Sequence, residues 1–94
     1  MAAEVTDQAG SSVGITLRYF AAAGAAAGSD SEQLTVRTGA TVGELVDGLG
    51  GRSPELARVL LRCSFLCDGV AVHDKAQPLH WGNTIDVLPP FAGG

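Results

Sequence analysis

The chain has little positive charge, and this scarcity excludes several classes of partner. Only 6 of its 94 residues are lysine or arginine, against 10 aspartates and glutamates, which gives a formal net charge of −4. Proteins that hold nucleic acid or an acidic membrane surface need clustered basic side chains to neutralise phosphates, and no basic stripe is present. We therefore expect no nucleic acid and no membrane among the partners, and a basic protein surface suits this chain better.

Long apolar runs are missing as well. No stretch approaches the roughly 20 apolar residues that a membrane-spanning helix needs, and the start lacks the positive charge and apolar core of a signal peptide. With 46% hydrophobic residues among 94, the chain has enough apolar surface for one small domain and too little for two. We predict a cytoplasmic protein with a single core.

The chain has only two cysteines, Cys63 and Cys67. If they lie along one strand, about 13 Å separates them at about 3.3 Å per residue, which exceeds the reach of a disulfide. A helix would bring them close enough, but the apolar and aromatic content of residues 64 to 67 favours a strand. We expect buried, reduced thiols.

Patterns for metal binding or catalysis are weak. The side chains that might be assembled into a metal site are Cys63, Cys67, His73 and His80. Their spacing matches no compact zinc pattern, so we expect no metal. A nucleophilic cysteine needs a lowered pKa and a positioned base, which its apolar neighbours do not provide. The glycines of residues 48 to 51 lack the lysine of a phosphate loop and are interpreted as a helix stop.

Strict alternation of apolar and polar residues predicts strands at three places. The first spans residues 13 to 20, the second includes Leu34 and Val36 and closes at Gly39, and the last spans residues 84 to 88. A short connection links the first two strands, which predicts that they pair antiparallel. Within that connection, alanines at residues 21 to 27 predict a weak helix, interrupted at Gly24 and capped at Gly28.

Two further helices are indicated by their caps. Thr41 and Glu44 form a capping-box pattern ahead of an apolar face made by Val42, Leu45, Val46 and Leu49. Residues 50 and 51, both glycine, end this helix. Ser53 then fits an N-cap with Pro54 in the first helical position, which predicts a second helix.

A hairpin is predicted around Asp68 and Gly69, a dipeptide that accepts positive φ at both positions of a type I′ turn. Its strands are residues 64 to 67 and 70 to 73, so Asp68 is interpreted as a turn residue and not as an acid catalyst. Residues 74 to 83 form a loop, where Trp81 either packs locally or belongs to a partner-binding patch.

The predicted order is strand, helix, strand, two helices and three strands. A final apolar strand returning beside the first gives an α+β fold of the β-grasp, ubiquitin-like type, with a mixed sheet of about five strands and helices on one face. We divide the chain into a disordered N-terminal leader (1–12), the β-grasp domain (13–88) and a flexible C-terminal arm (89–94).

The sequence of the C-terminal arm points to chemistry at its end. Gly93 and Gly94 have no Cβ, so a terminus built from them can enter a narrow active site. A carboxylate is a poor acyl donor until it is activated, most simply as an acyl-adenylate made with ATP by a separate enzyme. Pro89 and Pro90 keep the arm extended, and Phe91 suits a partner's pocket.

Several of these segments resemble one family. They are residues 15 to 21 (ITLRYFA), 41 to 45 (TVGEL), 78 to 79 (PL), 82 to 87 (GNTIDV) and 89 to 94 (PPFAGG). The sequence resembles the ubiquitin-like MoaD/ThiS sulfur carriers from about Val13 onward. It is most similar to the MoaD branch, the small subunits of molybdopterin synthase.

The resemblance implies a function for the arm. Gly94 would be adenylated by an E1-like, MoeB-like enzyme that uses ATP, converted to a thiocarboxylate, and inserted into a MoaE-like large subunit to donate sulfur to precursor Z. The residues that shape the inserted arm would be Pro89, Pro90, Phe91, Ala92 and Gly93. The chain itself would bind no cofactor and supply no catalytic side chain.

Two other functions remain open at this point. The chain is also consistent with a sulfur carrier for another pathway, such as thiazole formation, tRNA thiolation or cysteine synthesis. It is also consistent with a ubiquitin-like modifier that is conjugated to lysines of target proteins. All three functions use the same C-terminal arm, although Phe91 and the absence of lysines beyond Lys75 favour a carrier over a modifier.

Overall fold

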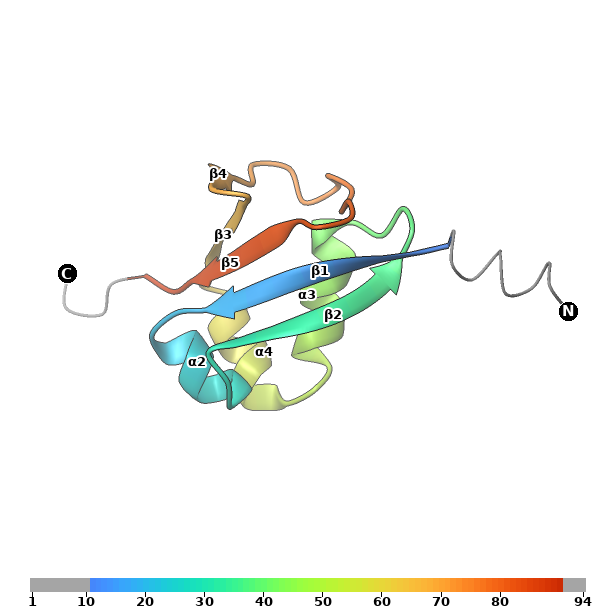
Figure 1. Cartoon of the computed structure of the whole chain (residues 1–94). Helices are drawn as coiled ribbons and strands as arrows, with labels where there is room; N and C mark the ends of the chain where they lie inside the picture. Colours follow the sequence, from blue (N-terminus) through green and yellow to red (C-terminus); the bar gives the residue numbers. More distant parts are fainter. Residues whose placement is uncertain (1–10, 91–94) are drawn as a thin grey trace, which may run out of the picture.

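The structure, a computed structural model, describes residues 11–90. It contains a five-stranded mixed sheet and three helices (Figure 1). The elements in chain order are β1 (Ser12–Tyr19), α2 (Ala22–Ala27), β2 (Ser31–Arg37), α3 (Val42–Gly50), α4 (Pro54–Leu60), β3 (Ser64–Cys67), β4 (Val70–Ala71) and β5 (Thr84–Leu88). The predicted α+β, β-grasp fold is confirmed.

The sheet has the strand order β2-β1-β5-β3-β4. β1 pairs antiparallel with β2 and parallel with β5, so the last strand lies in the centre of the sheet beside the first. β3 pairs antiparallel with β5 on its other side, and β4 completes that edge. A central strand loses more apolar surface to its neighbours than an edge strand, which explains why β5 is the most apolar segment near the end of the chain.

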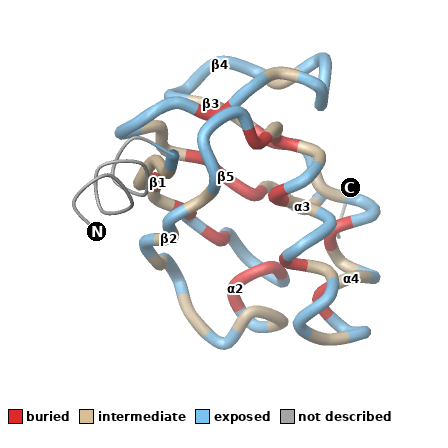
Figure 2. Tube along the Cα trace, turned by 90° about the vertical axis from the view of Figure 1, so that its right-hand side faces the viewer, coloured by how far each residue is buried: buried red, intermediate tan, exposed pale blue. Residues whose placement is uncertain are grey.

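Alternation along the strands separates the two faces of the sheet. Most helix-facing positions of β1 and β5 are almost fully buried and form one core with the helices, whereas those of β2 are half-buried (Figure 2). Its members are Ile15, Leu17, Tyr19, Ala23, Val42, Leu45, Leu49, Leu56, Leu60, Phe65, Leu79, Ile85 and Val87. In Figure 2, α3 and α4 lie together on one side of the strands. We call the opposite side, which no described helix covers, the open face.

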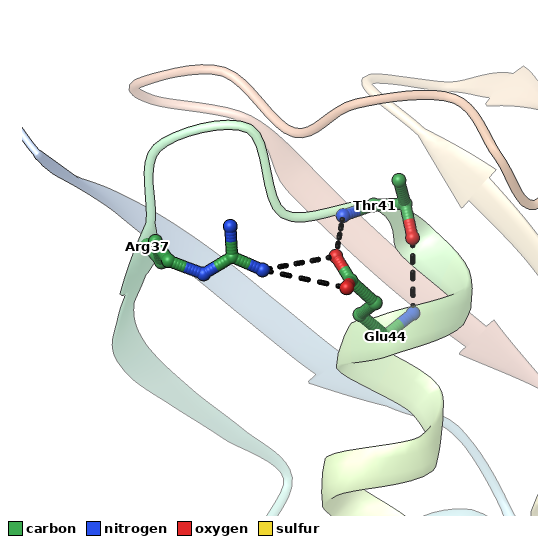
Figure 3. Close-up of polar contacts among 3 residues, drawn as sticks. All are labelled: Arg37, Thr41 and Glu44. Atoms are coloured by element: carbon green, nitrogen blue, oxygen red, sulfur yellow. Dashed lines mark hydrogen bonds and ion pairs between the residues drawn. The ribbon is translucent and has the colours of Figure 1, made fainter.

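The predicted capping box of α3 is present. The Thr41 hydroxyl accepts a hydrogen bond from the Glu44 N–H at 3.1 Å, and the Glu44 carboxylate accepts one from the Thr41 N–H at 3.0 Å (Figure 3). Arg37 at the end of β2 adds an exposed ion pair to Glu44 at 3.3 Å. α4 begins as predicted, with the Ser53 hydroxyl accepting from the Leu56 N–H. Satisfied N-terminal donors fix where both helices start.

Three local predictions differ from the structure. α2 is not interrupted at Gly24, because this glycine is buried and a Cβ there would lie 3.4 Å from the Tyr19 carbonyl oxygen. Gly24 thus allows close packing within a continuous helix. β4 is shorter than predicted and ends at Ala71, although the Val72 N–H still donates to the Phe65 carbonyl at 2.9 Å. β1 begins at Ser12, the last residue assigned to the leader, whose residues 1 to 10 lie outside the described part of the chain.

Candidate functional site at the base of the C-terminal arm

The base of the C-terminal arm is fixed by β5. Ile85 and Val87 are fully buried, and the Val87 carbonyl accepts a hydrogen bond from the Phe20 N–H at 3.1 Å. β5 ends at Leu88, directly before Pro89, because proline cannot donate to a ladder. The arm therefore leaves the sheet at a defined point beside Phe20.

Only the first part of the arm is described. Pro89 is half-buried and Pro90 is exposed. The predicted working end, Phe91, Ala92, Gly93 and Gly94, lies outside the described residues, so its predicted role is carried forward as a proposal.

Arg18 and Asp86 form an ion pair on the open face next to this base. They are direct partners in the β1–β5 register, and Arg18 Nε and Nη2 donate to the two Asp86 carboxylate oxygens at 2.6 and 2.9 Å. Asp86 is only 5% exposed, and its hydrogen bond raises the pKa of the Arg18 guanidinium. The pair is charge-neutral, which suits a surface that is desolvated on binding.

Apolar side chains surround this ion pair. Phe20 is 40% exposed and lies under the Arg18 guanidinium, with 5.7 Å from Cζ to the ring centroid. Leu66 is opposite Asp86 in the register and Leu88 follows it on the same strand, and both are half-buried. The open face around the arm is therefore apolar with one compensated charge pair. The sequence analysis did not predict this surface. It could have been noticed because Arg18 and Asp86 each stand between two apolar residues of a predicted strand, which places both on the face away from the core.

Trp81 lies at the other end of the open face. Its indole is 78% exposed, and one ring face packs on Gly14, where a Cβ would lie 3.0 Å from Cζ3. The ring forms one wall of a shallow groove of about 390 Å³ over β1 and β2. The ring therefore packs locally, which was one of the two predictions for Trp81. It also leaves a large aromatic surface exposed, as the other prediction, a partner-binding patch, requires.

The two cysteines are free, half-buried thiols. Cys63 lies just before β3, and its thiol donates to the Val59 carbonyl at 3.2 Å, whereas Cys67 ends β3. Burial raises the pKa of the Cys63 thiol, and burial together with the nearby Asp68 carboxylate raises the pKa of Cys67. The thiols are free, as predicted, but they are only half-buried and not buried, because both side chains lie at the margin of the core. Among residues 11–90, no three histidine, cysteine or acidic side chains are grouped so that they would hold a metal ion.

Asp68 is a turn residue, as predicted, with φ of 51° ahead of Gly69 at 84°. Its carboxylate also accepts hydrogen bonds from Asn83 Nδ2 at 2.7 Å and from the Thr84 N–H at 2.8 Å. These contacts fasten the start of β5 to the β3–β4 turn. Asp68 therefore helps to position the strand that carries the arm.

Comparison with known proteins identifies the family. The model of the ThiS family matches residues 17–94, which is most of the chain. The chain belongs to the ThiS family. It is thus a ubiquitin-fold member of the ThiS/MoaD sulfur carriers, as the sequence resemblance predicted. None of the curated proteins matches this ThiS-family chain.

Solved structures similar to this ThiS-family protein share its fold. SAMP1, small archaeal modifier protein 1 from Haloferax volcanii, is 28% identical with a TM-score of 0.74, covering 86% of this chain and 99% of its own. A putative molybdopterin converting factor subunit 1 from Pyrococcus furiosus is 23% identical with a TM-score of 0.76, covering 83% and 98%. A complex of subunits 1 and 2 of the molybdopterin-converting factor from Helicobacter pylori contains a chain 21% identical, with a TM-score of 0.61, covering 87% and 100%.

The described helices of the ThiS-family protein are short. Within residues 11–90, none has the length and apolar character needed to cross a membrane.

Proposed function

We propose that this ThiS-family protein is the small subunit of a molybdopterin synthase, which carries sulfur on Gly94 and donates it to precursor Z. The observation that carries the proposal is the placement of β5. The strand is buried in the centre of the sheet, and the sequence Pro-Pro-Phe-Ala-Gly-Gly follows it. A rigid base followed by a glycine-ended arm is suited to delivering a terminal carboxylate into another protein.

The proposed chemistry takes place on the Gly94 carboxylate. An E1-like, MoeB-like enzyme joins it to AMP with release of pyrophosphate from ATP. The outer sulfur of a persulfide donor then displaces AMP, and a donor thiol reduces the resulting S–S bond, which leaves a thiocarboxylate. Transfer of this sulfur to precursor Z and hydrolysis restore the carboxylate. No side chain of this protein acts as acid or base in the scheme.

A MoaE-like large subunit is the proposed partner of the arm and of the open face at its base. The Helicobacter pylori complex supports this pairing, because its subunit 1 shares the fold. The surface formed by Phe20, Leu66 and Leu88 around a neutral ion pair also has the low charge typical of interface centres.

A second candidate function is protein modification. The 28% identity to SAMP1 favours it, since that protein is a small archaeal modifier protein by name. In that case the activated Gly94 would form an isopeptide with lysines of target proteins. A sulfur carrier for thiazole formation, tRNA thiolation or cysteine synthesis would share the thiocarboxylate but have a different partner.

The state of Gly94 in cells separates these functions. The protein is purified from its native host with an N-terminal tag, and mass spectrometry identifies the terminus and the proteins that co-purify. A thiocarboxylate together with a large synthase subunit supports the proposal. A thiocarboxylate with other partners indicates a different sulfur pathway, and isopeptides on lysines of other proteins indicate a modifier.

A pair of extended chains tests the role of the terminus itself. One alanine added after Gly94 is expected to abolish sulfur transfer in a reconstituted assay and to leave the unfolding midpoint unchanged. One alanine added before Met1 is the matched control and should transfer sulfur normally. Full transfer by the C-terminally extended chain would rule out Gly94 as the acceptor of sulfur.

A further inference from the structure

The open face carries one charged pair close to the point where the arm departs. Arg18 and Asp86 are direct partners on the neighbouring strands β1 and β5 (Figure 1). β1, β3 and β5 all lie within the described part of the chain, and their other open-face positions hold serine, threonine, glycine and leucine. A charge that a partner places over these strands therefore has only this pair to interact with.

The register places uncharged residues on both sides of the pair. Arg18 lies opposite Ser31 of β2. On the other side, Asp86 lies opposite Leu66 of β3. Side chains that are directly opposed in antiparallel strands are in contact distance of each other, so these two are the lateral neighbours of the pair. Neither neighbour offers a second charge.

The Asp86 carboxylate is committed to Arg18. It is almost fully buried, and its two oxygens accept from Arg18 Nε at 2.6 Å and from Nη2 at 2.9 Å. A basic side chain of a partner would have to displace Arg18 to reach this carboxylate, and otherwise it would meet the guanidinium as a like charge. Both arrangements cost free energy in a site from which water is removed. The pair therefore disfavours a basic group at this position.

Arg18, in contrast, keeps N–H groups for a partner. Its side chain is 53% exposed, and Nη1 and the second N–H of Nη2 have no acceptor among residues 11–90. Water solvates these groups in the free protein. A partner that covers the face removes this water, and a donor that is then left without an acceptor costs free energy. The partner must therefore supply an acceptor opposite Arg18.

Phe20 helps to hold the guanidinium in place. Its ring lies 5.7 Å from Arg18 Cζ, so the cation is held both by the carboxylate and by an aromatic ring. A donor group that is fixed before binding loses little conformational freedom when a partner arrives. The exposed part of Phe20 and the half-buried Leu66 and Leu88 surround this donor with apolar surface.

The charge count decides which kind of acceptor fits. A carboxylate of the partner would place two anions beside one cation, and one negative charge would be buried without compensation. A main-chain carbonyl or a side-chain amide accepts from the same N–H groups and leaves the site neutral. The Arg18–Asp86 pair is therefore complementary to a neutral oxygen acceptor.

We propose that Arg18 determines which protein binds at the base of the arm, by donating to a neutral oxygen acceptor that the partner presents among apolar side chains. This inference rests on the proposed function, because the partner concerned is the MoaE-like large subunit that would receive the arm. It adds the chemistry of the contact. A protein that places an acidic or a basic side chain opposite Arg18 is rejected, because its charge stays uncompensated in the interface.

The variant Asp86→Asn distinguishes the two kinds of acceptor. The whole chain, as wild type and as variant, is titrated calorimetrically with the purified large subunit. If the acceptor is neutral, the variant buries a guanidinium charge without a counter-ion, and the affinity should fall at least about tenfold. If the acceptor is a carboxylate, the variant removes the competing anion and the affinity should rise. An unchanged or increased affinity would overturn the proposal, and an unfolding curve verifies that the variant is folded.

Replacing both members of the pair tests Arg18 as a donor. Arg18→Met combined with Asp86→Leu exchanges the ion pair for apolar side chains of similar size and leaves no charge unpaired, so the fold should persist. The partner's acceptor then loses its donor, and the affinity for the large subunit should again fall at least about tenfold. Binding as tight as that of the wild type would show that the pair only fills the surface.

Arg58→Met is the matched control for the loss of a positive charge. Arg58 is an exposed residue of α4, on the side of the sheet opposite the open face (Figure 2). Its replacement should leave the affinity for the large subunit unchanged. A loss as large as that of the double variant would mean that net charge, and not the contact at Arg18, controls binding.

Failure of this inference is distinguishable from failure of the proposed function. If the wild type binds the large subunit and transfers sulfur, but both open-face variants bind equally well, the role of Arg18 is refuted and the proposal for Gly94 stands. If the wild type neither binds the large subunit nor transfers sulfur, the proposed function is refuted and this inference is refuted with it.

Discussion

At the scale of single residues, Glu32 joins the sheet to the end of α3. Its carboxylate accepts hydrogen bonds from Arg52 Nη1 at 2.7 Å and from the buried Tyr19 hydroxyl at 2.6 Å. The hydrogen bond from Arg52 lowers the pKa of Glu32, although partial burial opposes this shift. Burial, followed by the hydrogen bond to Glu32, raises the pKa of Tyr19. The ionised carboxylate is therefore the form that the fold stabilises.

This lowered pKa gives a signed prediction for stability. Ionised Glu32 stabilises the fold fully at pH values above its unfolded-state pKa of about 4.3. This stabilisation is lost as the pH falls through the lower pKa of Glu32 in the folded protein. The wild type should thus lose more unfolding free energy between about pH 6 and pH 3 than Glu32→Gln, as measured by urea unfolding. Glu55→Gln serves as the control. Equal acid sensitivity in the wild type and Glu32→Gln would contradict the assignment.

The cysteines carry a second prediction at the residue scale. Because burial raises the pKa of both thiols, the thiolate is scarce near neutral pH and alkylation by iodoacetamide should be slower than in the unfolded chain.

Replacing Cys63 and Cys67 together by alanine should reduce stability by about 1–2 kcal/mol, the usual range for point substitutions. Sulfur transfer should be unchanged. A folded double variant unable to carry sulfur would show that a thiol takes part.

At the scale of elements, helix caps were the most informative local signals. The starts of α3 and α4 follow from Thr41 and Ser53, whose hydroxyls satisfy backbone donors within three residues. Strand periodicity was similarly reliable. The error at Gly24 arose because tertiary packing against Tyr19, and not local preference, decided that the helix continued.

The capping box of α3 gives the prediction for this scale. Thr41→Ala removes the acceptor for the Glu44 N–H and should lower the free energy of unfolding by about 1 kcal/mol. Thr41→Ser keeps the hydroxyl and should lose much less. Chemical denaturation of the three proteins measures the difference, and equal losses in both variants would mean that the methyl group, not the cap, stabilises this site.

At the scale of the whole molecule, the sheet fixes the point at which the arm departs. β5 is held by β1 and β3 along its length and by Asp68 at its start, so the point of departure of the arm is defined. Pro89 and Pro90 extend this rigidity beyond the sheet because their φ angles are restricted.

Loosening the arm should therefore affect transfer and not folding. Replacing Pro89 and Pro90 by glycine increases the conformational entropy of the free arm. Ordering the arm on a partner would then cost about 1 kcal/mol more per replaced residue. We expect the concentration of large subunit that gives a half-maximal rate of sulfur transfer to rise roughly tenfold or more. The unfolding midpoint should not change. If a titration gives the same half-saturating concentration of large subunit for both proteins, the prolines do not preorganise the arm.

The sequence alone determined the element order and the β-grasp fold, because these depend on local periodicity and caps, and the role proposed for Gly94 likewise comes from the residues of the arm. Tertiary structure decided what depends on residues far apart in the chain. Arg18 and Asp86 meet only because β1 and β5 are parallel neighbours, and Leu79 joins the core from a predicted loop because its N–H donates to the Ala40 carbonyl beside α3. The free edge of β2 likewise follows from strand order, since whether a strand has one neighbour or two is a property of the assembled sheet and not of its own residues.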